Sequence, residues 1–237
     1  MKSWREDCLG RLTPASASST ALLKELAAIT GELGFEYCSY VLKAPVPITR
    51  PRVVWSSNYP DRWLDRYFSN NYLDIDPLIQ RASRDAQPVV WASDSFEGQP
   101  EFWEEARSHG VRYGWALSTR GPHMSTGLLS LARSDQAITA SELDETEMKL
   151  VWLSHLTAGL VSTAESSMFI PESAYQLTDR ECEVLRWSAA GKTAEEIGKI
   201  LGITERTVTF HVTSSLSKLD VTNKTQAVAK ALLLKLI

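Results

Sequence analysis

Helical and strand-like patterns of apolar residues alternate through the first two thirds of the chain. Apolar positions three and four residues apart, bounded by proline, glycine and capping residues, predict five helices, at 21–33, 60–69, 77–84, 100–109 and 139–161. Alternating apolar and polar positions predict five strands, at 37–44, 52–57, 88–92, 112–120 and 126–134. Helices before, between and after five strands favour an α/β/α sandwich around one five-stranded antiparallel sheet.

The predicted helix at 139–161 differs from the others, because its segment MKLVWLSHLTAGLV is apolar on more than one face. A surface helix has a single apolar stripe. Either this helix is buried on both sides, or its second face meets a partner. We favour a contact between two copies of the chain, which would make the protein a homodimer.

A second domain is predicted at 177–237, after a linker at 164–176 in which Ser, Glu and Pro interrupt the periodicity. The first domain then spans 1–163, and the whole chain is an α+β protein. The second domain contains four short helices. Residue pairs with the spacing of a capping box open its first two helices, namely Thr178 with Glu181 and Thr193 with Glu196.

The middle of this second domain has the pattern of a helix-turn-helix, in which a short turn containing glycine, here Gly202-Ile203, joins two helices. The apolar residues of the following helix lie on one stripe, at Val208, Val212, Leu216 and Leu219. The outward positions carry no acid and are Thr209, Phe210, Thr213, Ser214 and Ser217. Phosphates repel carboxylates, while hydroxyls reach base edges and phosphate oxygens, so this face suits the major groove of DNA.

Candidate DNA contacts surround this third helix. Phe210 could lie against a thymine methyl group, or it could belong to a second layer of the core. Basic residues are candidates for phosphate contacts, and hydroxyl residues for base or phosphate contacts. The full set is Lys192, Thr193, Arg206, Thr207, Thr209, Phe210, His211, Thr213, Ser214, Lys218 and Lys224.

The charge distribution agrees with a C-terminal DNA-binding domain that is joined to an N-terminal domain of another kind. The net charge of the chain is −4, which does not suit a protein that coats nucleic acid generally. From Tyr175 onward, however, nine basic residues face seven acidic ones, so this part is net positive and the remainder is net negative.

Several classes of protein are disfavoured by what the sequence lacks. We expect neither a signal peptide nor a membrane span, and hence a cytoplasmic protein. Three widely spaced cysteines without a CxxC motif predict neither disulfides nor a zinc site, and no other metal site is expected. The motifs GxSxG, HExxH, GxGxxG and the P-loop are absent, and the histidines are scattered, at 109, 123, 155 and 211. We therefore expect a protein that is not an enzyme.

The C-terminal segment, LTDRECEVLRWSAAGKTAEEIGKILGITERTVTFHVTSSLSKLDVTNKTQAVAKALL, resembles the LuxR-type DNA-binding domain without gaps. The matching positions include Glu181, Leu185, Gly191, Ile197, Thr207, Val208, His211, Lys218 and Leu219. The resemblance implies that the third helix enters the major groove of a palindromic site and that the fourth helps to pair two domains. An activator of this kind would also contact RNA polymerase. Thr209 and Thr213 depart from many members, so the base preference does not carry over.

The N-terminal domain is rich in Trp and Tyr, which suits either an aromatic core or a ligand pocket with apolar walls and a few polar groups. No phosphorylatable receiver pattern is present. Instead the segments YPDRWLDRY, DIDP, VVW, EFWEEARSHGVRYGW and GLLSLAR resemble the autoinducer-binding domain of acyl-homoserine lactone receptors, over most of residues 20–163.

This second resemblance implies roles for the matching residues. Trp63 would donate its indole N–H to the lactone carbonyl, and Asp76 would accept the amide N–H of the ligand. Tyr59, helped by Ser130, would bond the acyl carbonyl, and Trp91 would pack against the lactone ring. The remaining candidates are walls, at Tyr67, Phe102, Trp103, Val111 and Trp115, with Ser39 at the acyl end.

Two of these residues have an equally good structural explanation. Asp76 precedes Pro77 and could cap a helix, and Tyr59 precedes Pro60 and could pack at a helix entry. An acyl lactone, however, presents one N–H donor and two carbonyl acceptors, and Asp, Trp and Tyr supply the complementary set.

Taken together, the sequence predicts a quorum-sensing transcriptional regulator that binds an N-acyl-homoserine lactone as its signal, needs no cofactor, and binds promoter DNA as a dimer. Two alternatives within regulation remain, a receptor for a different small molecule and a regulator that acts without ligand.

Overall fold

The computed structural model describes residues 3–47, 50–82, 85–92, 99–121, 124–165 and 175–237. The chain divides into two compact units, residues 1–43 with 53–166 and residues 44–52 with 167–237. The predicted linker at 164–176 lies mostly outside the described residues, as does His123. Among the helices of the described segments, none has the length and apolarity needed to cross a membrane.

The N-terminal unit contains the predicted five-stranded antiparallel sheet, in the order β2-β1-β5-β4-β3. Its strands are β1 (Tyr37–Lys43), β2 (Val53–Ser57), β3 (Val89–Ala92), β4 (Tyr113–Arg120) and β5 (Thr126–Arg133). The three central strands are buried along nearly their whole length. Such burial on both faces explains why they read as almost continuous apolar runs rather than as strict alternation.

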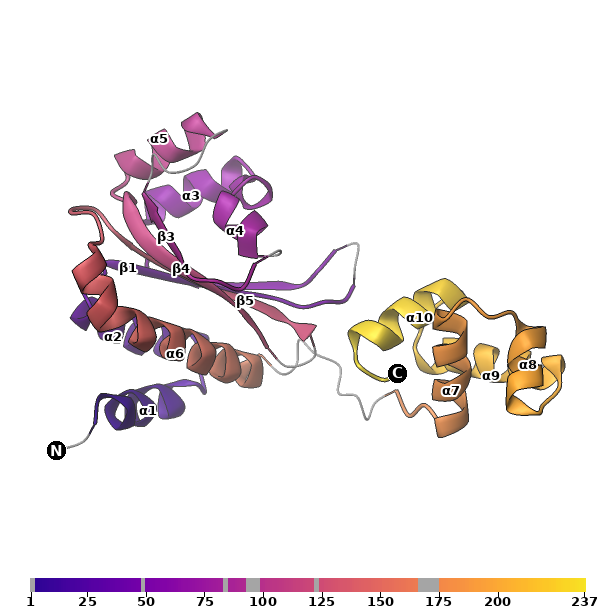
Figure 1. Cartoon of the computed structure of the whole chain (residues 1–237). Coiled ribbons are helices and arrows are strands. Elements are labelled where there is room, and N and C mark those ends of the chain that lie inside the picture. The colour runs from indigo at the N-terminus through magenta and orange to yellow at the C-terminus, as the bar shows by residue number, and fades with distance from the viewer. Residues whose placement is uncertain (1–2, 48–49, 83–84, 93–98, 122–123, 166–174) are drawn as a thin grey trace. The chain divides into compact units, whose positions relative to one another are not determined.

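Helices cover both faces of the sheet (Figure 1), which confirms the predicted sandwich. One face carries α1 (Trp4–Ala15), α2 (Ser19–Glu32) and α6 (Ala140–Ala164). The other face carries α3 (Asp61–Ser69), the 3-10 turn η1 (Tyr72–Asp74), α4 (Pro77–Ala82) and α5 (Pro100–Ser108).

The sequence pattern did not predict α1, because only Cys8 and Leu12 of this helix are fully buried and no apolar stripe is visible. Its start is set by a capping box between Ser3 and Glu6. The helix packs on α2 and also reaches α6, where the rings of Trp4 and Trp152 lie 5.4 Å apart. Part of the second apolar face of α6 is therefore covered by the chain itself.

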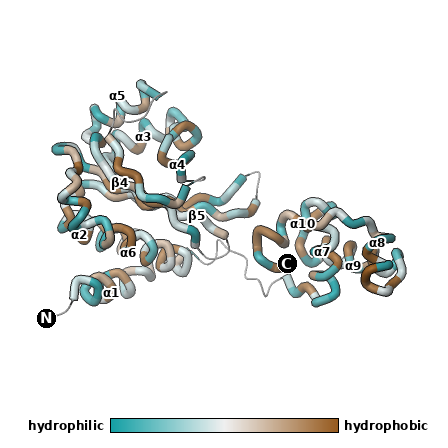
Figure 2. Tube along the Cα trace, viewed as in Figure 1, coloured by the Kyte–Doolittle hydropathy of each residue, from teal (hydrophilic) through white to brown (hydrophobic). Residues whose placement is uncertain are grey.

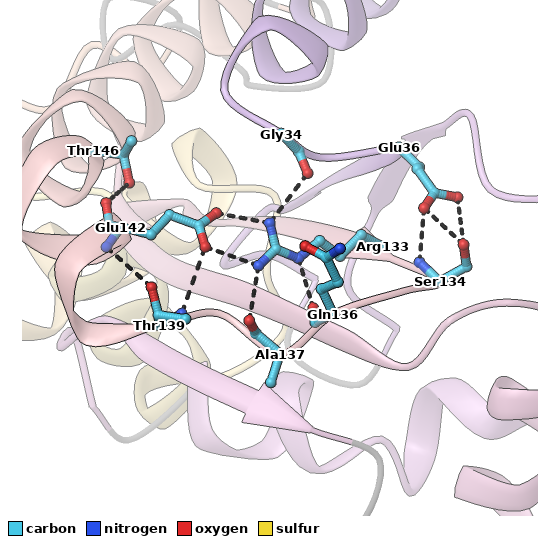
Figure 3. A network of polar contacts seen from close by, with 9 residues as sticks. All are labelled: Gly34, Glu36, Arg133, Ser134, Gln136, Ala137, Thr139, Glu142 and Thr146. Carbon is cyan, nitrogen blue, oxygen red and sulfur yellow. Dashed lines mark hydrogen bonds and ion pairs between the residues drawn. The ribbon is translucent and has the colours of Figure 1, made fainter.

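One arginine joins the end of β5 to the end of α2 and to α6 (Figure 3). The side chain of Arg133 is 11% exposed and uses all five of its N–H groups. Two of them bond both carboxylate oxygens of Glu142 in α6, at 2.7 and 2.8 Å. The others bond the carbonyl oxygens of Gly34, Gln136 and Ala137. Gly34 ends α2 with a φ of +90°, a conformation that glycine adopts without strain.

The C-terminal unit consists of α7 (Asp179–Ala189), α8 (Ala194–Leu201), α9 (Glu205–Lys218) and α10 (Lys224–Leu233). Both predicted capping boxes are present, and Gly202 ends α8 in the left-handed conformation. Val184, Ile197 and Val208 form a small core between the first three helices. Figure 2 shows stretches of hydrophobic residues in the helices of this unit, as well as in the strands of the sheet.

Replacing Arg133 by Met should lower the free energy of unfolding by roughly 3 kcal/mol, because it leaves the partly buried Glu142 carboxylate and three carbonyls without their donor. Urea unfolding followed by tryptophan fluorescence measures this change. The control is Arg11→Met, which removes ion pairs to more exposed acids and should cost less than about 1 kcal/mol. Equal effects of the two substitutions would contradict the special role of Arg133.

Candidate functional site

A cavity of about 40 Å³ lies between the sheet and the helices α3, α4 and α5. Its lining is mostly aromatic and aliphatic, with a few polar groups among them. The lining residues are Ser39, Val41, Trp55, Tyr59, Trp63, Tyr67, Asp76, Leu78, Ile79, Trp91, Phe102, Trp103, Ala106, Val111, Leu128 and Ser130.

The aromatic wall comes mainly from α3 and α5. Trp63 and Tyr67 lie four residues apart, so they share the buried face of α3, and their rings are 5.7 Å apart. Phe102 of α5 packs on both rings, at 5.7 and 6.2 Å. Outside the cavity, Arg66 bonds both carboxylate oxygens of Glu105, which fastens α3 to α5. The hydrogen-bonded guanidinium of Arg66 lowers the pKa of Glu105.

Asp76 is the acidic group in this wall and is 8% exposed. One carboxylate oxygen accepts a hydrogen bond from the amide of Leu78 in the first turn of α4, and the other accepts from the hydroxyl of Tyr67, each at 2.8 Å. Burial raises the pKa of Asp76, and these hydrogen bonds offset only part of that rise. Asp76 therefore caps the helix and also lines the cavity, so the two interpretations of this residue are compatible.

The sheet supplies hydroxyl groups to the floor of the cavity. The hydroxyl of Tyr59 lies 3.3 Å from Oγ of Ser130, and either atom can be the donor. Burial raises the pKa of Tyr59, so this phenol stays protonated. Ser39 is the cross-strand partner of Ser130. In the described part of the chain, Oγ of Ser39, Nε1 of Trp55 and Nε1 of Trp91 are polar atoms of lining residues that have no hydrogen-bond partner.

Trp91 lies directly on β4, in the space left by Gly114. A Cβ at position 114 would overlap the Trp91 ring and the backbone carbonyl of Leu131. The position of this indole in the cavity wall therefore depends on a glycine on the neighbouring strand, which the sequence analysis did not single out.

Ten of the eleven predicted ligand residues line this one cavity. The exception is Trp115, which lies on the opposite face of the sheet, where its indole N–H donates to Glu147 of α6 at 3.3 Å. Its prediction as a cavity wall is wrong, because side chains alternate along β4 and its neighbours Gly114 and Ala116 occupy the cavity face.

Six further lining residues were not predicted from the sequence, namely Val41, Trp55, Leu78, Ile79, Ala106 and Leu128. Two of them could have been found from strand periodicity. Val41 lies two residues after Ser39 on β1, and Leu128 lies two residues before Ser130 on β5, so each shares a face with a predicted residue. The others depend on helix packing that the pattern does not specify.

In the C-terminal unit, α9 presents the predicted outward face. Phe210 is 67% exposed, so its alternative assignment to a second core layer is wrong. Thr209 and Thr213 are also exposed, and their hydroxyls bond carbonyl oxygens one turn back along the helix. Arg206 and Lys224 are exposed, whereas His211 is half-buried.

Three further candidates near α9 hold local structure. Lys192 pairs with Glu196 at 3.5 Å, and Thr193 caps α8. The hydroxyl of Thr207 lies 2.8 Å from that of Thr204.

Two predicted DNA contacts are tied to a buried acid instead of pointing freely outward. Glu181 of α7 is 3% exposed and accepts hydrogen bonds from Ser214 at 2.6 Å and Lys218 at 2.8 Å, both on α9. Burial alone would raise the pKa of Glu181, but the hydrogen bonds from Lys218, Ser214 and the amide of Thr178 lower it to about 2. This carboxylate therefore holds α9 against the start of α7.

A cavity with a directed set of polar groups, in a chain that also carries a helix-turn-helix unit, defines a ligand-responsive DNA-binding regulator. Residues 18–158 match the family model of the autoinducer binding domain, and residues 175–231 match that of the bacterial regulatory proteins of the luxR family. The chain belongs to the LuxR family of transcriptional regulators, of the quorum-sensing type, and is not an enzyme.

Relatives resemble this chain along its length. The transcriptional activator protein AnoR of Acinetobacter nosocomialis is 37% identical over 239 residues and all of both chains. The crystal structure of Escherichia coli SdiA, at 32% identity, superposes with a TM-score of 0.77 and covers 99% of this chain and 98% of that chain. The N-acylhomoserine lactone dependent factor CepR2 of Burkholderia cenocepacia, at 31% identity, has a TM-score of 0.62 over 68% of this chain and 94% of its own.

Replacing Glu181 by Gln should weaken DNA binding and remove an acid-sensitive part of the stability. Because the folded pKa lies below the unfolded value of about 4.3, the carboxylate stabilises the fold above that pH, and this contribution is lost as the pH falls toward about 2. Melting temperatures of wild type and variant should therefore differ most at about pH 6, differ by roughly half as much at about pH 3, and converge only below about pH 2.

The matched control for this prediction is Glu183→Gln, on the same helix, where the side chain is 43% exposed and pairs with Arg180. This substitution should change neither the DNA affinity nor the pH profile appreciably. A difference between wild type and Glu181→Gln that stays constant with pH would contradict the role of the charge.

Proposed function

We propose that the cavity of the N-terminal unit binds an N-acyl-homoserine lactone. The observation that carries this proposal is the buried carboxylate of Asp76, which faces a cavity that also holds the side chains of Tyr59 and Trp63. Asp76 accepts the amide N–H of the ligand, the indole of Trp63 donates to the lactone carbonyl, and the Tyr59–Ser130 pair donates to the acyl carbonyl. Trp91 packs against the lactone ring.

The remaining lining supports an acyl compound. Apart from these polar groups, the cavity walls are hydrocarbon and aromatic surfaces, which suit a fatty chain. The similarity to CepR2, which is described as N-acylhomoserine lactone dependent, points to the same ligand class. A ligand without the amide N–H would leave the buried carboxylate short of a donor, at a cost of about 1–3 kcal/mol.

In the same proposal, the protein binds palindromic promoter DNA as a homodimer in the cytoplasm, with α9 in the major groove. The exposed Thr209, Phe210 and Thr213 read bases, while basic groups bond phosphates, with Ser214 and Lys218 held in place by Glu181. The phosphate contacts come from Arg206, His211, Lys192 and Lys224, and hydroxyls of Thr193 and Thr207 lie beside them. A dimer places two such helices on the two halves of a symmetric site. Contact with RNA polymerase follows if the protein activates transcription.

Ligand gates this activity by completing the packing of the N-terminal unit. A ligand that binds the folded state stabilises it by about 2.7 kcal/mol at a concentration of 100 times Kd. The stabilised dimer then sets the spacing of the two α9 helices.

The ligand proposal is tested by replacing Asp76 with Asn, which keeps an oxygen for the Leu78 amide but loses the charged acceptor. Lactone affinity, measured by tryptophan fluorescence, should fall at least about tenfold. Because burial raises the pKa of Asp76, the ionised group costs stability at neutral pH, so the variant should unfold no more easily than wild type.

The control variant is Asp74→Asn, whose side chain is exposed and which should bind normally. A matched ester analogue, in which oxygen replaces the amide N–H, should bind wild type at least about tenfold more weakly than the lactone amide. Lactone affinity unchanged by Asp76→Asn, or equal affinities of ester and amide, would contradict the proposed role of the carboxylate.

Gating is tested with rigorously ligand-free protein. It should melt at a lower temperature than the protein with lactone and bind palindromic DNA weakly in a gel-shift assay, because the N-terminal unit lacks the stabilisation that ligand supplies. Full thermal stability and full DNA binding without ligand would show that the protein acts independently of a signal. Binding of no acyl lactone at all would indicate a receptor for a different molecule.

A further inference from the structure

Three serines form a row across the cavity face of the sheet. Ser57 of β2, Ser39 of β1 and Ser130 of β5 are cross-strand partners in register. The outer two have partners within the chain. Ser57 donates to the carbonyl of Cys38 and accepts from the amide of Tyr59, and Ser130 bonds the hydroxyl of Tyr59.

The middle serine of the row is different. Ser39 is 3% exposed, lines the cavity, and has no hydrogen-bond partner for its Oγ among the described residues. A buried hydroxyl without a partner costs about 1–3 kcal/mol. A group that supplies the missing bond would therefore gain affinity at this position.

A second unpartnered donor lies in the same wall. Trp55, two residues before Ser57 on β2, also lines the cavity, and its Nε1 is buried without a partner in the described segments. Its ring is held by those of Tyr67 and Phe68, at 5.1 and 5.3 Å. Because an indole N–H only donates, the complementary ligand group must be an acceptor.

We propose that the preferred ligand carries an oxygen on the third carbon of its acyl chain, bonded by Ser39 and the indole of Trp55. This inference rests on the proposed function, in which the Tyr59–Ser130 pair bonds the carbonyl at the first carbon. Neighbouring strands lie about 4.8 Å apart, so the side chain of Ser39 stands one strand further along the sheet. An oxygen two carbons further along the acyl chain falls at that position.

The cavity lining next to Ser39 and Trp55 is apolar, so the polar part of the ligand's acyl chain ends at the third carbon. Val41 and Leu128, the next residues on the same face of β1 and β5, are apolar, as are Leu78 and Ile79 of α4. Both a keto and a hydroxyl oxygen can accept from these donors, whereas a plain methylene leaves both unpartnered. The ligand class is therefore a 3-oxo- or 3-hydroxyacyl-homoserine lactone.

The test compares three lactones of equal chain length that differ only at the third carbon, as methylene, hydroxyl or ketone. Affinities for the full-length protein are measured by tryptophan fluorescence. At least one oxygenated lactone should bind roughly 3- to 10-fold more tightly than the methylene compound. Equal affinities of all three for wild type would overturn the proposal.

Two conservative variants assign the preference to its residues. Ser39→Ala and Trp55→Phe should each lower the ratio between the affinity for the oxygenated lactone and that for the methylene lactone, toward equal affinities. The control is Ser56→Ala, which lies next to Trp55 on β2 but away from the cavity lining. This variant should keep the full preference. Loss of affinity for all three lactones alike, in either variant, would show a packing role and count against the proposal.

The same measurements separate this inference from the function on which it rests. If the proposed function fails, none of the three lactones binds, or Asp76→Asn binds them as well as wild type does. If only the inference fails, all three bind and all three depend on Asp76, but the third carbon makes no difference.

Discussion

The buried carboxylate of Asp76 is the constraint around which the N-terminal unit is organised. A carboxylate among aromatic rings is tolerated only when its oxygens find donors, and here Tyr67 and the amide of Leu78 provide them. Those two bonds fix the start of α4 relative to α3, and so they set the shape of the cavity. Among the described residues, the hydrogen-bond donors to this group are a hydroxyl and backbone amides, none of them cationic, so burial dominates and the pKa of Asp76 is raised.

The two faces of the sheet have different tasks. On the face that carries α2 and α6, Arg133 bonds both carboxylate oxygens of Glu142, and Trp115 fastens β4 to α6. On the other face, small and polar residues such as Gly114, Ser39 and Ser130 leave room for a cavity under α3 and α5. On the cavity face, Ser39, Trp55 and Trp91 carry polar atoms without partners in the described part of the chain, and a ligand would supply those partners.

A second buried carboxylate, that of Glu181, has a lowered pKa instead of a raised one. It accepts a hydrogen bond from an ammonium group, that of Lys218, in addition to those from Ser214 and the Thr178 amide. The pKa of Glu181 is therefore lowered, although its side chain is largely shielded from solvent. An acid held permanently ionised suits a fixed joint between α7 and α9, whereas an acid that lacks a cation is suited to receive a donor from a ligand.

Within the described segments, the sequence by itself determined the five strands, every α-helix except α1, the capping boxes of α7 and α8 and the helix-turn-helix, because each rests on local spacing or on a family motif. For the same reason, ten of the eleven residues proposed for the ligand line the cavity. Only the tertiary structure decided which face each side chain takes. Trp115 lies between Gly114 and Ala116, which face the cavity, yet the alternation of side chains along β4 directs its indole to α6. In the same way, the sequence pattern places Ser214 and Lys218 on the outward face of α9, whereas in the folded unit both bond Glu181 of α7. Contacts between distant segments leave no periodic signal along one chain, and they determine which polar groups are satisfied and which remain for a ligand.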